Sequence, residues 1–180
     1  MPIYSESGLT INLPNQDYFR VSDCPTWRKK LNTLSLKKMD FGWWDETTNQ
    51  IYFLEVKDFT QLDHPKSKKP KKSQDFIKDF VTKATDTLFL LAGVWLSSSK
   101  GESMKNELFA TCPNFPTSLS KIKLLFVVKT TDPSAGIWIA DLNNEIRNQL
   151  RGRVILFDLN PDDVILIDHQ TAIRKGVPIS

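Results

Sequence analysis

Three residues in one short stretch have the side chains needed to bind a metal ion and activate water. Asp40 is followed, after fourteen residues, by Glu55-Val56-Lys57. Two adjacent carboxylates repel each other unless a cation lies between them, and oxygen ligands suit Mg²⁺. The backbone carbonyl of Val56 could add a third oxygen. The Lys57 ammonium could position or deprotonate water and offset charge at phosphorus, so these residues predict hydrolysis of a phosphodiester.

The surrounding sequence predicts a hairpin that would bring these residues together. Residues 39–44 and 51–58 are typical of two strands joined by a polar turn. If a four-residue loop closes the hairpin, the numbers of paired residues sum to 95. Asp40 then lies across from Glu55, with Cβ atoms roughly 5 Å apart, and Lys57 shares their face. A slip of one residue would separate the carboxylates, and a slip of two would place them diagonally.

Asp40, the fourteen-residue gap and Glu55-Val56-Lys57 resemble the active-site signature of the PD-(D/E)XK nuclease superfamily. That family places its aspartate at the start of one strand and Glu-x-Lys in the next, and a helix and another strand follow. The resemblance covers roughly residues 25–130. It implies a restriction-endonuclease-like core of order αβββαβ, and a Mg²⁺-dependent endonuclease that acts on DNA, with Mn²⁺ as a substitute. Asp40, Glu55 and the Val56 carbonyl would bind the metal, and Lys57 would assist the water.

The sequence departs from the family pattern at two positions. Met39 stands where the family often has proline. The family's extra acidic residue in a first helix has Glu6 as its candidate here, because Glu6 is the only glutamate before Glu46. The family also often takes a polar or basic residue from the following helix. Lys83 is our candidate for that position, since it lies at the edge of an apolar stripe.

Two clusters of basic residues flank the predicted hairpin in sequence. Each one is typical of a solvated surface loop. Together, on either side of a site, they also predict edges that hold a phosphate backbone. The first cluster comprises Arg28, Lys29, Lys30, Lys37 and Lys38, and the second comprises Lys66, Lys68, Lys69, Lys71 and Lys72.

The composition predicts one folded domain over residues 1–180. Hydrophobic residues make up 40% and charged residues 25%, and a net charge of +3 does not by itself indicate a nucleic-acid partner. The longest apolar run, residues 88–96, is far shorter than the ~20 residues of a membrane span. The N-terminus lacks the features of a secretory signal. We therefore expect a cytoplasmic protein without membrane contact, with Cys24 and Cys112 as thiols.

The remaining pattern predicts a mixed α/β domain, of α+β type, around one central sheet with C-terminal additions. Apolar residues recur every three or four positions over residues 73–96, which predicts a long helix. A nearly continuous apolar run predicts a buried strand over residues 122–128. The other expected elements are a weak strand at 9–13, a short helix within 26–36, a polar loop over 97–120, a helix over 139–150 that stops at Gly152, and strands over 154–159 and 164–168.

Two other interpretations stay open at this point. The chain could be a nucleic-acid-binding module that keeps this fold without cleavage, and its binding would then fall with salt and survive loss of Asp40 or Glu55. It could also be unrelated to nucleic acids, with its carboxylates as ordinary surface residues paired to neighbouring lysines. If Asp40 and Glu55 faced opposite sides of the sheet, the nuclease interpretation would fail. A nuclease of this size would cut both strands most easily as a homodimer.

Overall fold

The computed structural model describes residues 2–60, 70–117 and 120–180 of the chain. Within these ranges the structure contains strands, α-helices and short 3₁₀ or π turns. The strands are β1 (Ile3–Glu6), β2 (Leu9–Asn12), β3 (Tyr18–Phe19), β4 (Phe41–Asp45), β5 (Gln50–Asp58), β6 (Lys121–Lys129) and β7 (Val164–Asp168). The α-helices are α1 (Pro70–Trp95), α2 (Ser99–Phe109), α3 (Ala135–Val154) and α4 (His169–Arg174).

The central sheet has five strands in the order β3-β4-β5-β6-β7. The first three form an antiparallel meander, whereas β5, β6 and β7 are parallel. Parallel neighbours need a crossover, and helices supply it, with α1 and α2 between β5 and β6 and α3 between β6 and β7. The predicted mixed α/β architecture around one sheet is confirmed.

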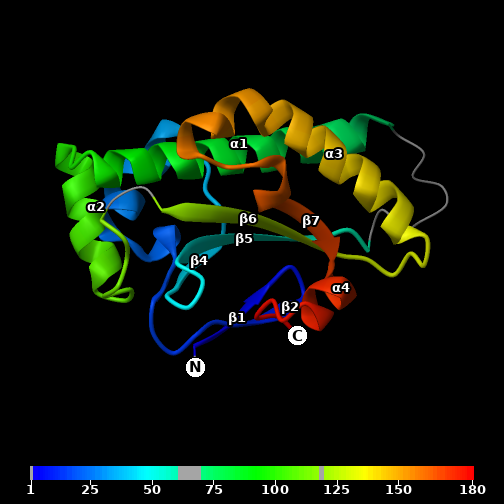
Figure 1. The fold of residues 1–180 in the computed structure, drawn as a ribbon, viewed down its shortest axis with the longest axis horizontal. Coiled ribbons are helices and arrows are strands. Elements are labelled where there is room, and N and C mark those ends of the chain that lie inside the picture. The colour runs from blue at the N-terminus through cyan, green and yellow to red at the C-terminus, as the bar shows by residue number, and fades with distance from the viewer. Residues whose placement is uncertain (1, 61–69, 118–119) are drawn as a thin grey trace.

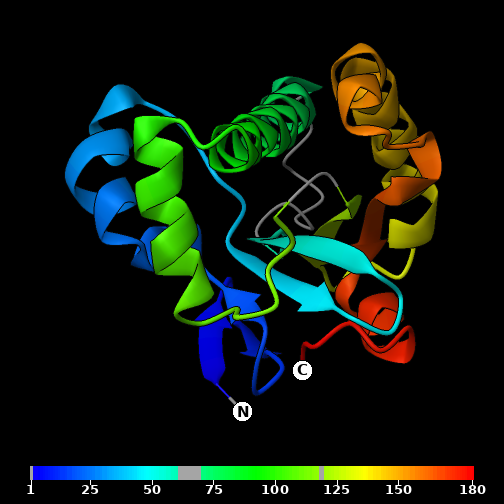
Figure 2. The same ribbon diagram turned by 60° about the vertical axis from the view of Figure 1, so that its left-hand side comes forward.

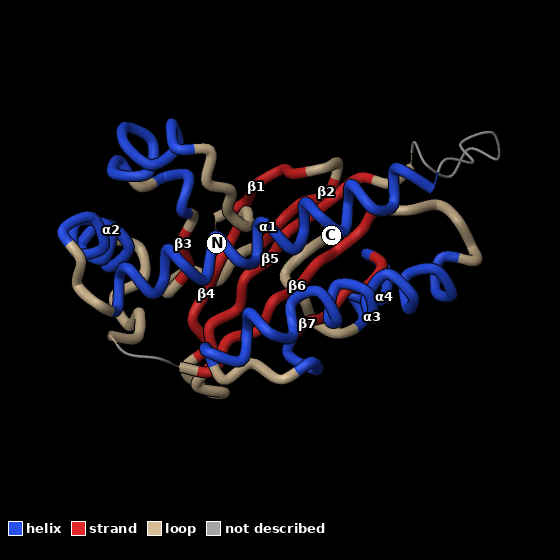
Figure 3. Tube along the Cα trace, turned by 90° about the horizontal axis from the view of Figure 1, so that it is seen from above, coloured by secondary structure: helices blue, strands red, loops and turns tan. Residues whose placement is uncertain are grey.

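Both faces of the sheet are covered, by different layers. Helices α1 and α3 lie over one face, and the β1–β2 hairpin and α4 lie under the other (Figure 1). Seen from above, α1 and α3 run alongside each other across the strands (Figure 3). Because both faces of the sheet are covered, side chains that point to either face of β5 and β6 are buried. This explains why the sequences of these two strands are nearly continuously apolar.

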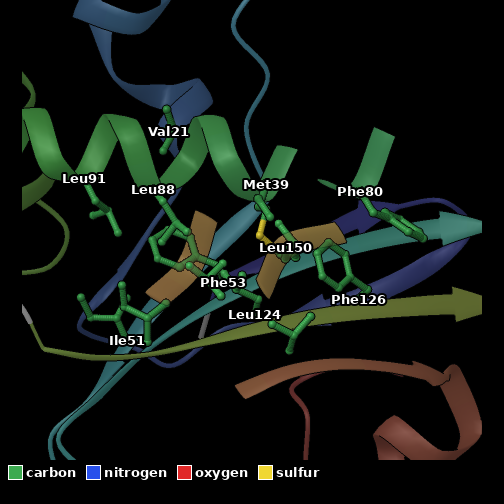
Figure 4. Packing of buried hydrophobic residues seen from close by; sticks show 14 of the residues in the cluster. Val21, Met39, Ile51, Phe53, Phe80, Leu88, Leu91, Leu124, Phe126 and Leu150 are labelled. Atoms are coloured by element: carbon green, nitrogen blue, oxygen red, sulfur yellow. The ribbon is translucent and has the colours of Figure 1, made fainter. Parts of the chain in front are cut away.

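The larger core lies between α1 and the sheet. The apolar stripe of α1, represented by Phe80 and Leu88, packs onto Phe53 of β5 and onto Leu124 and Phe126 of β6 (Figure 4). These side chains are at most 2% exposed. The helix predicted over residues 73–96 is therefore present as α1, and its stripe is core, as the spacing indicated.

The second core lies on the opposite face of the sheet. Leu54 and Val56 of β5 pack there against Ile11 of β2 and against α4. The end of the chain closes this layer, because Thr10 and Ser180 exchange two backbone hydrogen bonds of 2.8 Å, and Ile179 forms a β-bridge with Ile11. Strand β2 of the hairpin is thereby held beneath the sheet.

Three expected elements differ from those observed. Residues 154–159 were expected as a strand, but the apolar stripe of α3 continues through Leu150 to Val154, and a 3₁₀ turn (Ile155–Phe157) follows. Gly152 does not stop α3, because it does not adopt the positive φ with which a glycine ends a helix. The polar segment after α1 contains α2, which buries only Gly101, Met104 and Leu108. So few buried positions gave no helical signal in the sequence.

A short helical segment lies within residues 26–36, as expected, but a strand of the central sheet precedes it. It appears as the π turn η2 (Trp27–Leu31) and the 3₁₀ turn η3 (Asn32–Leu34), and both follow β3. Among the described residues, no helix precedes the β3–β5 meander, so the leading helix of the expected αβββαβ order is not observed. Figure 2 shows α2 beside this helical segment. Thr26 donates from its N–H and hydroxyl to the carboxylate of Glu107 on α2.

A close corner joins α1 to α2. The Ser98 hydroxyl caps α2 by accepting from the Gly101 N–H at 3.1 Å, and the Ser98 N–H donates to the Gly93 carbonyl at 3.2 Å. A Cβ atom added to Gly101 would lie within 3.0 Å of the Gly93 carbonyl group, closer than real Cβ atoms come to such a neighbour. The corner therefore requires glycine at position 101.

Two further expectations concern the state of the cysteines and the presence of a membrane-spanning helix. Cys24 and Cys112 are both buried and unpaired. Burial, with nearby carboxylates, raises the pKa of each thiol to about 12, which keeps both in the thiol form. Of the helices in the described ranges, none combines the length and the apolar character that crossing a membrane requires.

Candidate active site

Asp40 and Glu55 meet across the β4–β5 hairpin in the predicted register. Phe41 pairs with Leu54, so the numbers of paired residues sum to 95. One residue before β4, the Asp40 N–H donates to the Leu54 carbonyl at 3.0 Å, which extends the same pairing. Asp40 therefore lies across from Glu55 on the face covered by α1, and Lys57 lies two residues along β5 on that face.

Glu55 is an ionisable residue at the centre of the sheet, with 0% of its surface exposed. Its Oε1 accepts a hydrogen bond from Lys83 of α1 and lies 3.2 Å from the Lys57 ammonium. Its Oε2 is buried and has no hydrogen-bond partner within the described part of the chain. Burial, and then the charge of Asp40, outweigh the two lysines and raise the pKa of Glu55 to about 8.

Lys83 connects the two carboxylates. Its ammonium contacts Glu55 and lies 3.8 Å from Oδ1 of Asp40. The Lys83 side chain is only 15% exposed and that of Asp40 14%, so little water surrounds the group. The candidate that the sequence placed at the edge of the α1 stripe is thus brought into the site.

Lys57 lies between two carboxylates, Glu55 and Asp79. Its ammonium is 3.2 Å from Oδ2 of Asp79, whose other oxygen lies 2.6 Å from the Lys37 ammonium. Burial alone would lower the pKa of Lys57, but the charges of Glu55 and Asp79 outweigh it and raise that pKa. Burial would raise the pKa of Asp79, yet the bond from Lys37 and the charge of Lys57 hold it below its ordinary value. The geometry therefore keeps Lys57 as an ammonium.

Asp79 is the site residue that the sequence analysis missed. It lies on α1 one turn before Lys83, so both project from the same side of the helix. The available signal was a carboxylate four residues before a lysine at the boundary of an apolar stripe. Such pairs are common on solvated helix surfaces, and only the packing of α1 over β5 distinguishes this one.

Helix α1 also fixes the chain that leads into Asp40. The Lys37 N–H donates to Oδ2 of Asp86 at 2.8 Å, and the buried Met39 N–H donates to the Thr87 hydroxyl at 2.9 Å. Both acceptors belong to α1. The backbone that precedes Asp40 is therefore hydrogen-bonded to α1, which is also the helix that carries Lys83.

The Val56 carbonyl, predicted as a third metal ligand, faces the turn of the β1–β2 hairpin. The Ser7 hydroxyl donates to it at 3.1 Å. Ser7 and Gly8 have positive φ values of 51° and 70°, and Lys129 of β6 holds the turn through the Gly8 carbonyl at 2.9 Å. Glu6 ends β1 next to this turn, but its carboxylate has no hydrogen bond or ion pair with the described residues, so it does not join the site.

The carboxylates at Asp40 and Glu55 suit a hard divalent cation by their chemistry. They are opposed on one face, and one oxygen of Glu55 lacks a partner within the described ranges. The described residues include no cluster of three or more His, Cys, Asp or Glu side chains that could hold a metal ion. The two carboxylates would therefore share an ion with water and the Val56 carbonyl. Mg²⁺ would suit these oxygen donors if the Lys83 ammonium moved aside.

The structure brings only part of the basic clusters to the site. Lys37 binds Asp79, and the half-buried Lys38 has its pKa lowered by burial, with the charge of Asp40 acting against that shift. The other members of the first cluster, Arg28, Lys29 and Lys30, are exposed and make no ion pair with Asp40 or Glu55. Arg28 pairs instead with Asp23 at 3.0 Å. Of the second cluster, Lys66, Lys68 and Lys69 lie outside the described residues, and Lys71 and Lys72 lie in the first turn of α1.

The raised pKa of Glu55 predicts a stability that falls as the pH rises. The folded state keeps its Glu55 proton up to about pH 8, whereas the unfolded chain loses it near 4.5. Between these values the folded state binds more protons, so the free energy of unfolding decreases with pH. Urea denaturation across this window should show a smaller decrease for Glu55→Gln than for the wild type. If the free energy of unfolding fell equally with pH in the two proteins, Glu55 would not be the group that titrates. Asp79 affects the pH dependence only below this window, because its pKa is lowered.

Comparison of the chain with protein-family models, with curated proteins and with solved structures finds no match. The candidate site therefore depends on the geometry described above and on the sequence motif that it contains.

Proposed function

We propose that this chain is a Mg²⁺-dependent nuclease that hydrolyses phosphodiester bonds, with DNA as its substrate. The observation that carries the proposal is the register of the hairpin, which places Asp40 across from Glu55 and puts Lys57 on the same face. The order of β4, β5, α1 and β6 also follows the order of the PD-(D/E)XK nuclease core. We therefore also propose that the fold is restriction-endonuclease-like.

The roles of the residues follow from their contacts. Asp40 and Glu55 would bind and orient Mg²⁺, together with the Val56 carbonyl. Lys57, held as an ammonium by Glu55 and Asp79, would donate hydrogen bonds to the attacking water and to a phosphate oxygen. When bound, Mg²⁺ supplies a lower pKa for its water and neutralises charge on the phosphate. The raised pKa of Lys57 favours this donor role over that of a general base.

Basic side chains next to the site support a polyanionic substrate. Lys37 and Lys38 precede Asp40, and they add two positive charges beside the carboxylates. Lys29 and Lys30 add exposed positive charge earlier in the chain. Binding to such groups weakens steeply with salt, because counterions are released from the nucleic acid.

A second candidate function is a nucleic-acid-binding module that does not cleave. One observation favours it, namely that the Lys83 ammonium already lies between the two carboxylates. In such a module this ammonium would be a permanent substitute for the metal. The two candidates differ in whether the purified protein cuts DNA when a divalent cation is supplied.

The test is cleavage of supercoiled and linear DNA with Mg²⁺, Mn²⁺ or EDTA. Wild-type protein should cut with either metal and not with EDTA, and Lys57→Met should lower the rate by about 10²-fold, since it removes a charged donor. Lys78→Met is the matched control, because Lys78 is an exposed lysine on α1 outside the site. Salt-sensitive binding without cleavage would favour the non-catalytic module, and neither binding nor cleavage would contradict both functions.

A further inference from the structure

We propose that the Lys83 ammonium is a built-in counter-ion that occupies the place of the divalent cation, and that a metal binds to Asp40 and Glu55 only by displacing it. This inference rests on the proposed function, since it concerns the same metal site. It assigns Lys83 a role in controlling metal occupancy and does not make it a catalytic residue.

The contacts of Lys83 identify it as the cation that occupies this place. Its ammonium contacts Oε1 of Glu55 and lies 3.8 Å from Oδ1 of Asp40, so it lies beside both carboxylates. A metal ion shared by the two carboxylates would need the same oxygens. An ammonium and a divalent cation cannot both lie there, because the two positive charges would repel each other in a site with little water.

Lys57 does not compete with a metal in this way. It has a second carboxylate in Asp79, which is held in turn by Lys37, and it can keep that partner when a metal binds Glu55. Among the described residues, Lys83 makes ion pairs only with Asp40 and Glu55. Metal binding would therefore release Lys83 and leave Lys57 in position.

The burial of the site explains why a resident cation is needed. Two opposed carboxylates, one of them with no exposed surface, would be costly in the folded protein without a counter-charge. Lys83 supplies that charge in the metal-free protein. The cost is a weaker affinity for metal, because each binding event must break the ion pairs of Lys83.

The first experiment measures Mn²⁺ binding to the wild type and to lysine variants by titration calorimetry. Lys83→Met should bind Mn²⁺ about tenfold more tightly than the wild type, because no buried ion pair has to be broken. Lys78→Met, which removes an exposed lysine from the same helix, should bind as the wild type does. If the wild type binds Mn²⁺ and Lys83→Met binds it equally or more weakly, the inference is overturned.

The second experiment uses the wild-type protein alone, so it does not depend on the folding of a variant. Lysines are acetylated with and without Mn²⁺, and the modified positions are measured by mass spectrometry. Labelling of Lys83 should rise when Mn²⁺ is added, while that of Lys78 stays constant. If Mn²⁺ binds and Lys83 labelling does not change, the inference fails and the proposed function stands. If neither the wild type nor Lys83→Met binds Mn²⁺, the proposed metal-dependent function itself fails.

Discussion

Replacing Glu55 by glutamine is expected to lower the rate of DNA cleavage by about 10³-fold while the domain stays folded. Glutamine has the same shape but cannot bind a cation as a carboxylate does. The fold should persist because each lysine next to Glu55 keeps another carboxylate, with Lys83 beside Asp40 and Lys57 beside Asp79. The measurement is single-turnover cleavage with Mg²⁺, with circular dichroism to confirm folding.

Glu46→Gln provides the matched control for this change. Glu46 is exposed in the turn between β4 and β5, and its replacement makes the same carboxyl-to-amide change in the same hairpin. It should leave the cleavage rate within about twofold of the wild type, as is usual for a surface substitution. A folded Glu55→Gln variant that cuts as fast as Glu46→Gln would remove Glu55 from the mechanism.

The largest effect on stability is expected from Gly101→Ala, which should lower the free energy of unfolding by about 3 kcal/mol. The new Cβ would collide with the carbonyl group of Gly93, which is backbone and cannot rotate away. Helix α2 would have to move from α1, and this would disturb the buried Met104 and Leu108. Urea denaturation followed by circular dichroism measures the change.

Gly152→Ala is the control for the glycine substitution itself. Gly152 is also helical, but a Cβ there meets nothing within 4 Å. Alanine favours a helix over glycine, so this variant should be more stable than the wild type by roughly 0.5–1 kcal/mol. If both variants changed stability in the same direction, the contact at the α1–α2 corner would not be the cause.

The sequence predicted those parts of the site geometry that depend on residues close together in the chain. The length of the turn fixed the register of β4 against β5, and the period of two residues fixed the shared face of Glu55 and Lys57. Strand β7 was expected at residues 164–168 and has those bounds. In each case, neighbours in the chain determine the structure.

The parts that sequence could not provide depend on packing between distant segments. The position of Asp79 beside Lys57 depends on the angle at which α1 crosses β5, and no local pattern contains that angle. The contact of Ser7 with the Val56 carbonyl depends on where the β1–β2 hairpin docks. Helix α2 buries too few side chains to produce a periodic signal, so its existence also depended on tertiary contacts.

The pairing of Thr10 with Ser180 has a consequence for the time course of refolding. These residues are separated by nearly the whole sequence, and contacts of such long range are usually slow to form, because the chain between them must be ordered first. The β1–β2 hairpin should therefore dock after the central sheet and α1 have assembled. We expect helical ellipticity to recover early, whereas the proposed DNA cleavage should return in a later, slower phase.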